Sequence, residues 1–255
     1  MSPEAKSDPA RRTFVLVHGA WHGGWCWTRV ASRLRALGHQ VFTPTLTGLG
    51  ERAHLLSPGI DLSVHVTDVV NLLRCEELED VILCGHSYGG LVITGVAAQV
   101  GAALRGVVYL DAFAPPDGQS LLESLPTEMA GLLRSWEHDG QIAAPPTAMM
   151  TQRTADAPWI QRRMTPQPAA TLKQAVTGGA AVDAVVRKVF VLADGQPSVF
   201  PLYAARVTAA PGWRLTHVAG GHDLMIDAPN EVTRILLEAA DGYSAGPGHP
   251  EECRT

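Results

Sequence analysis

Two hydrophobic patterns alternate along this chain: short continuous apolar runs, and longer segments in which apolar residues recur at helical spacing. Continuous runs are typical of parallel strands buried on both faces of a sheet. They lie at residues 14–17, 81–84, 107–110 and 189–192, with a weaker run at 40–46. The helical segments lie at residues 26–37, 61–74, 89–100 and 229–240. This alternation predicts an α/β fold built on a doubly wound, mostly parallel sheet.

Residues 117–185 interrupt the alternation. The interval contains no convincing strand, and prolines separate its helical fragments. Its bulky and soft apolar side chains serve either as ordinary packing or as the wall of an apolar pocket; they are Trp136, Met149, Met150, Trp159 and Met164. The pattern predicts a helical cap, residues 117–185, inserted into a core formed by residues 12–116 and 186–241. The polar segments 1–11 and 242–255 are expected to be flexible termini.

Composition narrows the range of partners. A chain of 255 residues that is 46% hydrophobic can form a sizeable core, which excludes a disordered or coiled-coil protein. The net charge is −5 and the basic residues are scattered, which argues against nucleic acid or an anionic membrane surface as a partner. The expectation is a small-molecule partner, and a homodimer is compatible with it.

Neither a metal nor another cofactor is expected. The four cysteines show no CxxC pair, and His18 and His22 lie four residues apart in a glycine-rich turn without an acid nearby. The N-terminal segment is polar where a signal peptide would be apolar. Together these features favour a cytoplasmic protein with reduced, structural cysteines.

The strongest chemical motif is Gly85-His86-Ser87-Tyr88-Gly89, which follows an apolar run and precedes a helical segment. This is the G-x-S-x-G nucleophile elbow in the strand, turn and helix context that it requires. A serine on such a turn is strained, and a side chain at either glycine would collide with neighbouring backbone. The following helix directs its N-terminal N–H groups toward the site. Ser87 is therefore the predicted nucleophile.

A serine hydroxyl requires a neighbouring base and donors for the oxyanion. His222 follows a short strand at residues 213–218 and precedes the last helix, which predicts a base at the carboxyl edge of the sheet. The predicted oxyanion donors are two backbone N–H groups. One belongs to Tyr88, next to the nucleophile, and the other to Ala20, in the turn after the first strand. His217, inside the strand, is expected to be structural.

Two aspartates compete as the acid that orients His222. Asp111 ends the strand that follows the elbow, and its apolar neighbours make it costly to bury without a partner. Asp194 ends the strand before His222, but Asp194-Gly195 followed by Pro197 is also ordinary turn chemistry. The sequence favours Asp111 and retains Asp194 as the alternative.

The segments HGAWHGGWCW, GHSYGG and GGHD, in this order, resemble the α/β-hydrolase superfamily. Within it, the chain is similar to bacterial carboxylesterases related to the plant methylesterase and hydroxynitrile lyase branch. The resemblance covers nearly the whole chain and implies the same nucleophile, base and oxyanion donors. The plant members place the acid where Asp194 falls, whereas YLDAFAPPDGQSL and MTPQP look more like bacterial relatives with the acid at Asp111. Hydroxynitrile lyases have a lysine and a threonine where this chain has Asp223 and Gly19, so the resemblance does not imply cyanohydrin cleavage.

The combined prediction is a serine hydrolase that cleaves small to medium carboxylic esters, apolar or aryl, or lactones, through an acyl-enzyme and without a cofactor. One rival is a cofactor-free perhydrolase or lyase that uses the same triad. Another is a receptor of the same fold that binds a ligand without turnover, and the intact set of Ser87, His222 and an aspartate argues against it.

Overall fold

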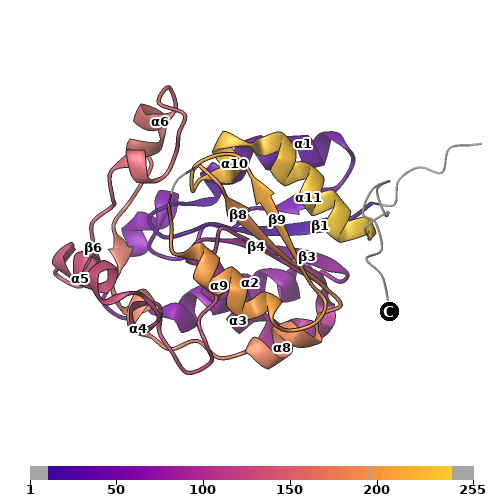
Figure 1. Cartoon of the computed structure of the whole chain (residues 1–255), viewed down its shortest axis with the longest axis horizontal. Helices are drawn as coiled ribbons and strands as arrows, with labels where there is room; N and C mark the ends of the chain where they lie inside the picture. The colour runs from indigo at the N-terminus through magenta and orange to yellow at the C-terminus, as the bar shows by residue number, and fades with distance from the viewer. Residues whose placement is uncertain (1–10, 196, 243–255) are drawn as a thin grey trace, which may run out of the picture.

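A six-stranded sheet forms the centre of the computed structural model, which describes residues 11–195 and 197–242 (Figure 1). All neighbouring strands are parallel, in the order β2-β1-β3-β4-β8-β9. The strands are β1 (Thr13–Val17), β2 (Gln40–Phe42), β3 (Val81–His86), β4 (Leu104–Leu110), β8 (Arg187–Ala193) and β9 (Trp213–Val218). The weak run at 40–46 is a strand only over its first three residues, because Pro44 has no N–H to donate to a ladder. The predicted doubly wound parallel sheet is confirmed.

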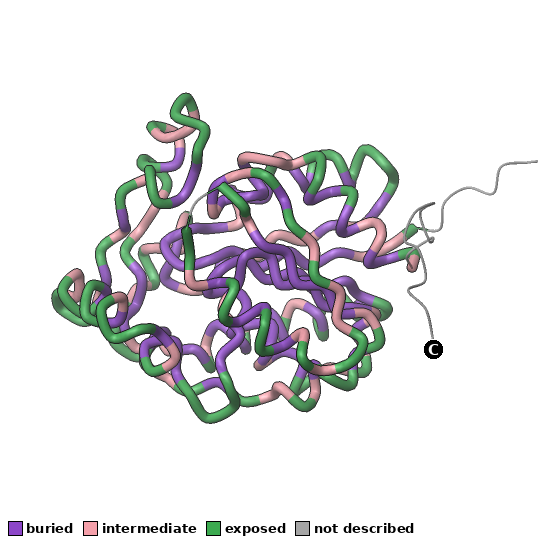
Figure 2. Tube along the Cα trace, in the orientation of Figure 1, coloured by how far each residue is buried: buried purple, intermediate pink, exposed green. Residues whose placement is uncertain are grey.

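Helices cover both faces of this sheet (Figures 1 and 2). Alternate residues of β1 point to opposite faces, so Phe14 and Leu16 pack into one apolar cluster while Val15 and Val17 pack into the other. The first face carries α1 (Thr28–Ala36), α10 (Leu224–Asp227) and α11 (Pro229–Asp241). The second face carries α2 (Leu62–Cys75), α3 (Gly89–Val100), α8 (Gly179–Ala184) and α9 (Phe200–Thr208). Three short 3-10 turns lie between these elements: η1 (Gly24–Trp27), η2 (Gly50–Leu55) and η3 (Gly101–Ala103).

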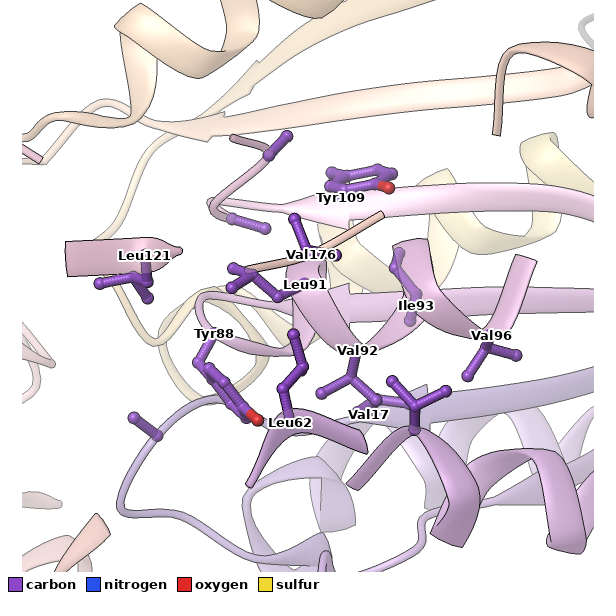
Figure 3. Close-up of a cluster of buried hydrophobic side chains, with 14 of the residues drawn as sticks. Val17, Leu62, Tyr88, Leu91, Val92, Ile93, Val96, Tyr109, Leu121 and Val176 are labelled. Atoms are coloured by element: carbon purple, nitrogen blue, oxygen red, sulfur yellow. The ribbon is translucent and has the colours of Figure 1, made fainter. Parts of the chain in front are cut away.

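Helix α3 lies at the centre of the larger cluster (Figure 3). Its side chains are apolar around most of its circumference, which is typical of a helix enclosed by other elements. Leu91, Val92, Ile93 and Val96 are inaccessible to solvent, and burial of each such side chain stabilises the fold by roughly 1.5–3 kcal/mol. The residues that begin this helix therefore stand on a rigid support.

The chain between β4 and β8 forms most of a separate layer beside the sheet (Figure 1). Its helical elements are α4 (Leu121–Ser124), α5 (Thr127–Ser135), η4 (Thr147–Met149), α6 (Ala157–Gln161) and α7 (Ala170–Lys173). The expectation that this interval lacks strands was wrong. β5 (Glu137–His138), β6 (Gln141–Ile142) and β7 (Gln167–Pro168) pair as a small antiparallel sheet, but two-residue strands leave no periodicity in a sequence. The boundaries 117 and 185 stay a prediction; near the second one, α8 packs against α3 of the core.

The winding of the sheet reverses between β1 and β3. From β1 the chain first adds β2 on one side, then returns to add β3, β4, β8 and β9 on the other. Crevices at such reversals, beyond the carboxyl ends of the strands, are the usual ligand sites of open α/β sheets. The predicted flexible termini fall almost entirely outside the described residues, and within those residues no helix has the length and apolar character needed to span a bilayer.

Candidate active site

Ser87 lies at the carboxyl end of β3 in a strained turn. Its φ of +52° is in the left-handed region, which is costly for a residue with a side chain. The backbone around it is held from three directions. Its N–H donates to the Leu110 carbonyl at 3.3 Å, and its carbonyl accepts from the N–H groups of Gly90 at 3.0 Å and Phe113 at 3.1 Å. These bonds fix the serine at the reversal of the sheet.

The two glycines of the elbow allow close contact between backbones. A Cβ at Gly85 would lie 2.5 Å from the carbonyl oxygen of Gly89. A Cβ at Gly89 would lie 2.9 Å from the carbonyl oxygens of both Val17 and His18. Backbone atoms cannot move away as the end of a flexible side chain can, so either substitution would displace the turn that carries Ser87.

The structure brings Asp111, and not Asp194, to His222. The Nδ1–H of His222 donates to Asp111 Oδ2 at 2.7 Å, while Asp111 Oδ1 accepts the N–H of Ala193 at 3.1 Å. Asp111 is only 1% exposed, so the carboxylate has exchanged water for these two donors. Asp194 instead accepts from His217 Nδ1 at 2.8 Å in a half-exposed pair.

Two side chains besides Asp111, those of Phe200 and His86, hold His222 in place. Its ring stacks on Phe200, with centroids 4.8 Å apart and planes 8° from parallel, and the His86 ring lies 4.5 Å away. Its carbonyl accepts a hydrogen bond from His86 Nε2–H at 3.0 Å. Because Nδ1 donates to a carboxylate, the neutral ring keeps its lone pair on Nε2. His222 and Ser87 line the same cavity.

The two predicted oxyanion donors line that cavity as well. Within residues 11–195 and 197–242, no carbonyl or side chain accepts a hydrogen bond from the backbone N–H of Ala20 or Tyr88. The peptide unit that carries the Ala20 N–H is oriented by His18, whose Nδ1–H donates to the Gly19 carbonyl at 2.8 Å while Nε2 accepts from Leu46 N–H at 3.0 Å. Burial lowers the pKa of His18 to about 3, so its ring is neutral and has no lone pair left for a metal.

The sequence matches the Alpha/beta hydrolase family over residues 14–235. The chain belongs to this family. It is 42% identical to the carbendazim hydrolyzing esterase of Nocardioides sp. (strain SG-4G) over 235 residues, which cover 88% of this chain and 97% of that protein. It is 35% identical to Methylesterase 2 of Arabidopsis thaliana over 119 residues, 42% of each chain. These relatives confirm the branch that the motifs indicated.

A solved structure of an extracellular alpha/beta-hydrolase from a Paenibacillus species superposes with a TM-score of 0.80 at 26% identity, covering 89% of this chain and 98% of that one. That protein is described as sharing structural and functional homology with tobacco salicylic acid binding protein 2. The likeness over nearly the full length of both chains confirms the α/β-hydrolase fold.

The cavity of this hydrolase has a volume of about 410 Å³ and an apolar wall. Of the five bulky cap residues for which the sequence left packing and pocket wall open, three line the cavity: Trp136, Met149 and Met150. Trp159 and Met164 do not. Trp159 packs edge-on against Trp25 with ring centroids 5.0 Å apart, and Met164 packs against the apolar core. Further cap residues on the wall are Leu121, Met129, Leu132, Leu133, Pro145 and Leu172.

The core supplies three aromatic wall residues that sequence reasoning missed. Trp21 follows Ala20, Phe113 lies two residues beyond Asp111, and Phe200 stacks on His222. A signal was present for the first two, because each large aromatic side chain lies within two residues of a predicted site residue at the carboxyl edge of the sheet. Phe200 lies on α9, and only the fold brings it to the site.

Three hydrogen bonds tie the cap of the hydrolase to the turn that carries Ala20. The N–H of Trp21 donates to Gln167 Oε1 at 3.1 Å, and its carbonyl accepts the N–H of Thr165 at 2.9 Å. The indole N–H of Trp21 donates to the Ile142 carbonyl at 3.0 Å. A mobile lid would not make three such bonds to one residue of the core.

A second set of bonds ties the cap to the His222 loop. The N–H of Asp223 donates to the Met150 carbonyl at 2.7 Å. Asp227 accepts from the hydroxyl of Thr151, from Gln152 N–H at 3.0 Å and from Gly221 N–H at 2.7 Å. The cap therefore supports both the Ala20 turn and the His222 loop.

Proposed function

We propose that this chain is a serine carboxylic-ester hydrolase in which Ser87 is the nucleophile, His222 the base, and Asp111 the acid that orients it. The observation that carries the proposal is the 2.7 Å hydrogen bond from His222 to the buried Asp111, on the wall of the cavity that Ser87 also lines. The esterase relatives support ester hydrolysis as the reaction class.

The reaction follows from the roles of these groups. Ser87 Oγ attacks the ester carbonyl carbon while its proton passes to His222 Nε2, and the N–H groups of Ala20 and Tyr88 stabilise the oxyanion. The bond from carbon to the alkoxy oxygen then breaks, and the imidazolium returns its proton to the leaving alcohol. Water repeats the sequence on the acyl-enzyme, releasing the acid and restoring Ser87.

The substrate class follows from the wall of the cavity. Apart from the catalytic groups and Ser198, the residues that line it are apolar or aromatic. Such a wall stabilises an uncharged, apolar acyl or aryl group and leaves a charged one without a partner. Neutral aryl esters and lactones of small to medium size are the proposed substrates. Carbendazim belongs in the first substrate panel because the 42% identical relative is named for hydrolysing it.

The test combines covalent labelling with turnover. A fluorophosphonate reacts with an activated serine, so it should add once to the protein, and peptide mapping should place the adduct on Ser87 and not on Ser198, which lines the same cavity. Ser87→Ala should lose the adduct and retain roughly 10⁻⁴ to 10⁻⁶ of the parent turnover of p-nitrophenyl butyrate. A folded Ser87→Ala protein that kept a tenth of the parent rate would show that another group is the nucleophile.

A further inference from the structure

Behind the proposed triad lies a buried cluster of three side chains, each next to a different part of the machinery. His22 is two residues beyond Ala20, His86 directly precedes Ser87, and Asp223 directly follows His222. Their exposed fractions are 1%, 0% and 0%. None of the three lines the cavity, so none can touch a substrate bound there.

His22 and Asp223 form a buried ion pair. His22 Nε2–H donates to Asp223 Oδ2 at 3.1 Å, and His22 Nδ1–H donates to the Ala20 carbonyl at 2.7 Å. Both ring nitrogens face acceptors, so His22 is held as an imidazolium. Burial opposes this charge, but the carboxylate of Asp223 and the hydrogen bonds outweigh it and raise the pKa of His22.

His86 connects the cluster to the backbone of the base. Its Nε2–H donates to the His222 carbonyl at 3.0 Å, and the same nitrogen is 3.8 Å from Asp223 Oδ1. Burial, followed by the neighbouring histidines, lowers the pKa of His86 well below its ordinary value, so this ring is neutral. Asp223 Oδ1 has no hydrogen-bond partner among the described residues, so the carboxylate relies on His22 for its compensation.

Two simpler roles do not account for these three residues. A metal site needs free lone pairs, but both nitrogens of His22 donate, and no group of three His, Cys, Asp or Glu residues in the described chain is arranged to hold an ion. Ordinary packing does not require an ion pair either, because apolar residues of similar volume stabilise a core as well as a buried pair or better.

We propose that the His22–Asp223 pair and His86 are positioning residues that lock the oxyanion turn, the nucleophile elbow and the base loop into one catalytic geometry. The inference rests on the proposed function, since it assigns these residues to the same reaction. His22 joins the carbonyl of Ala20 to the residue that follows His222, and His86 joins the residue before Ser87 to the carbonyl of His222. A displacement of about 1 Å between catalytic groups can cost on the order of 10² in rate.

The experiment compares Asp223→Asn with the parent on p-nitrophenyl butyrate. The substitution removes the charge that keeps His22 protonated, so the cation and the anion are lost together and the local net charge is unchanged. We expect kcat to fall by roughly 10- to 100-fold with little change in KM. We also expect the acid limb of the pH–rate profile to stay in place, because no net charge near His222 has changed.

Two further variants keep the inference falsifiable if Asp223→Asn fails to fold. His86→Gln retains an N–H donor for the His222 carbonyl and should retain more activity than His86→Leu, which has none. His39→Gln is the matched control. His39 is also buried, but it directly precedes β2 and so lies at the amino ends of the strands, away from the site at their carboxyl ends. It should turn over like the parent. Circular dichroism and thermal melting report folding for all variants.

The outcomes separate this inference from the proposed function. A parent protein that neither hydrolyses the ester nor reacts with the fluorophosphonate contradicts the proposed function itself. With an active parent, an unchanged kcat in folded Asp223→Asn, or equal rates in the two His86 variants, overturns the positioning role. A shift of the acid limb of the pH–rate profile without a lower kcat plateau also overturns it. That result would mean that the cluster acts on the charge of His222 and not on its position.

Discussion

Replacement of Asp111 by asparagine tests the proposed acid most directly, because the structure dictates how the new amide will lie. Asp111 Oδ1 accepts the N–H of Ala193 at 3.1 Å, and Oδ2 accepts from His222 Nδ1 at 2.7 Å. The Ala193 N–H will hold the amide oxygen of the asparagine. The amide NH₂ must then face His222, where it donates to Nδ1 instead of accepting from it.

The magnitude follows from that reversal. With Nδ1 forced to be an acceptor, the neutral ring carries its proton on Nε2 and cannot take one from Ser87. The buried carboxylate that stabilises the imidazolium is lost as well. Loss of the correct tautomer in a Ser-His-Asp triad costs on the order of 10³ to 10⁴ in kcat, or about 4–5.5 kcal/mol of transition-state stabilisation. The asparagine has nearly the same volume, so the fold should remain intact.

Asp194→Asn is the matched control, because Asp194 also bonds a histidine. Its pair with His217 is half exposed, and exposed ion pairs contribute little. We expect its turnover to stay within about tenfold of the parent, since asparagine suits turn geometry as well as aspartate does. The assay is kcat on p-nitrophenyl butyrate for parent and both variants, with folding checked by circular dichroism. A smaller loss for Asp111→Asn than for Asp194→Asn would refute the assignment and move the acid to Asp194.

Three other expectations concern stability, the crowded turn and the cavity wall. Burial lowers the pKa of His18 to about 3 and of His65 to about 4 from 6.5. As the pH falls, these two histidines therefore take up protons at a higher pH in the unfolded chain than in the folded protein. The free energy of unfolding should fall below pH 6.5 by roughly 1.4 kcal/mol per pH unit for each ring, and urea titrations showing equal stability at about pH 7 and pH 5 would contradict this. Gly19→Ala would place a Cβ 2.8 Å from the Cβ of Ser87, and kcat/KM should drop by roughly tenfold or more. Trp136→Ala enlarges the cavity and should raise kcat/KM for a naphthyl ester relative to a phenyl ester by roughly tenfold; an unchanged ratio would place the acyl or aryl group elsewhere.

The sequence predicted the parts of the site that are encoded locally. The elbow could be recognised because the strand, the two glycines and the helix around Ser87 are contiguous, and the apolar runs are continuous because both faces of the sheet are covered. The choice between Asp111 and Asp194 depended on which carboxylate reaches His222. That is a tertiary property, and both residues end strands at the same edge of the sheet.

The sequence did not predict the buried cluster of His22, His86 and Asp223 either, because its contacts are also tertiary. Sequence spacing relates His22 only to His18, four residues before it, whereas its partner Asp223 lies 201 residues away. One local signal was present. Asp223 directly precedes the apolar residues Leu224, Met225 and Ile226, and a carboxylate buried with them requires a compensating partner.

Two residues that bond the cap to the core also line the cavity, so each has two separate roles. Met150 offers its carbonyl to Asp223 N–H beside the base, while its side chain lines the cavity. Trp21 likewise holds the cap through its backbone and indole N–H while its ring forms part of the wall. Because a side chain at position 150 can change without altering the carbonyl, substrate preference there is open to mutation while the catalytic framework is conserved. Position 21 lacks this freedom, since the indole N–H is itself an anchor. Libraries aimed at new substrates should therefore randomise position 150 and keep tryptophan at position 21.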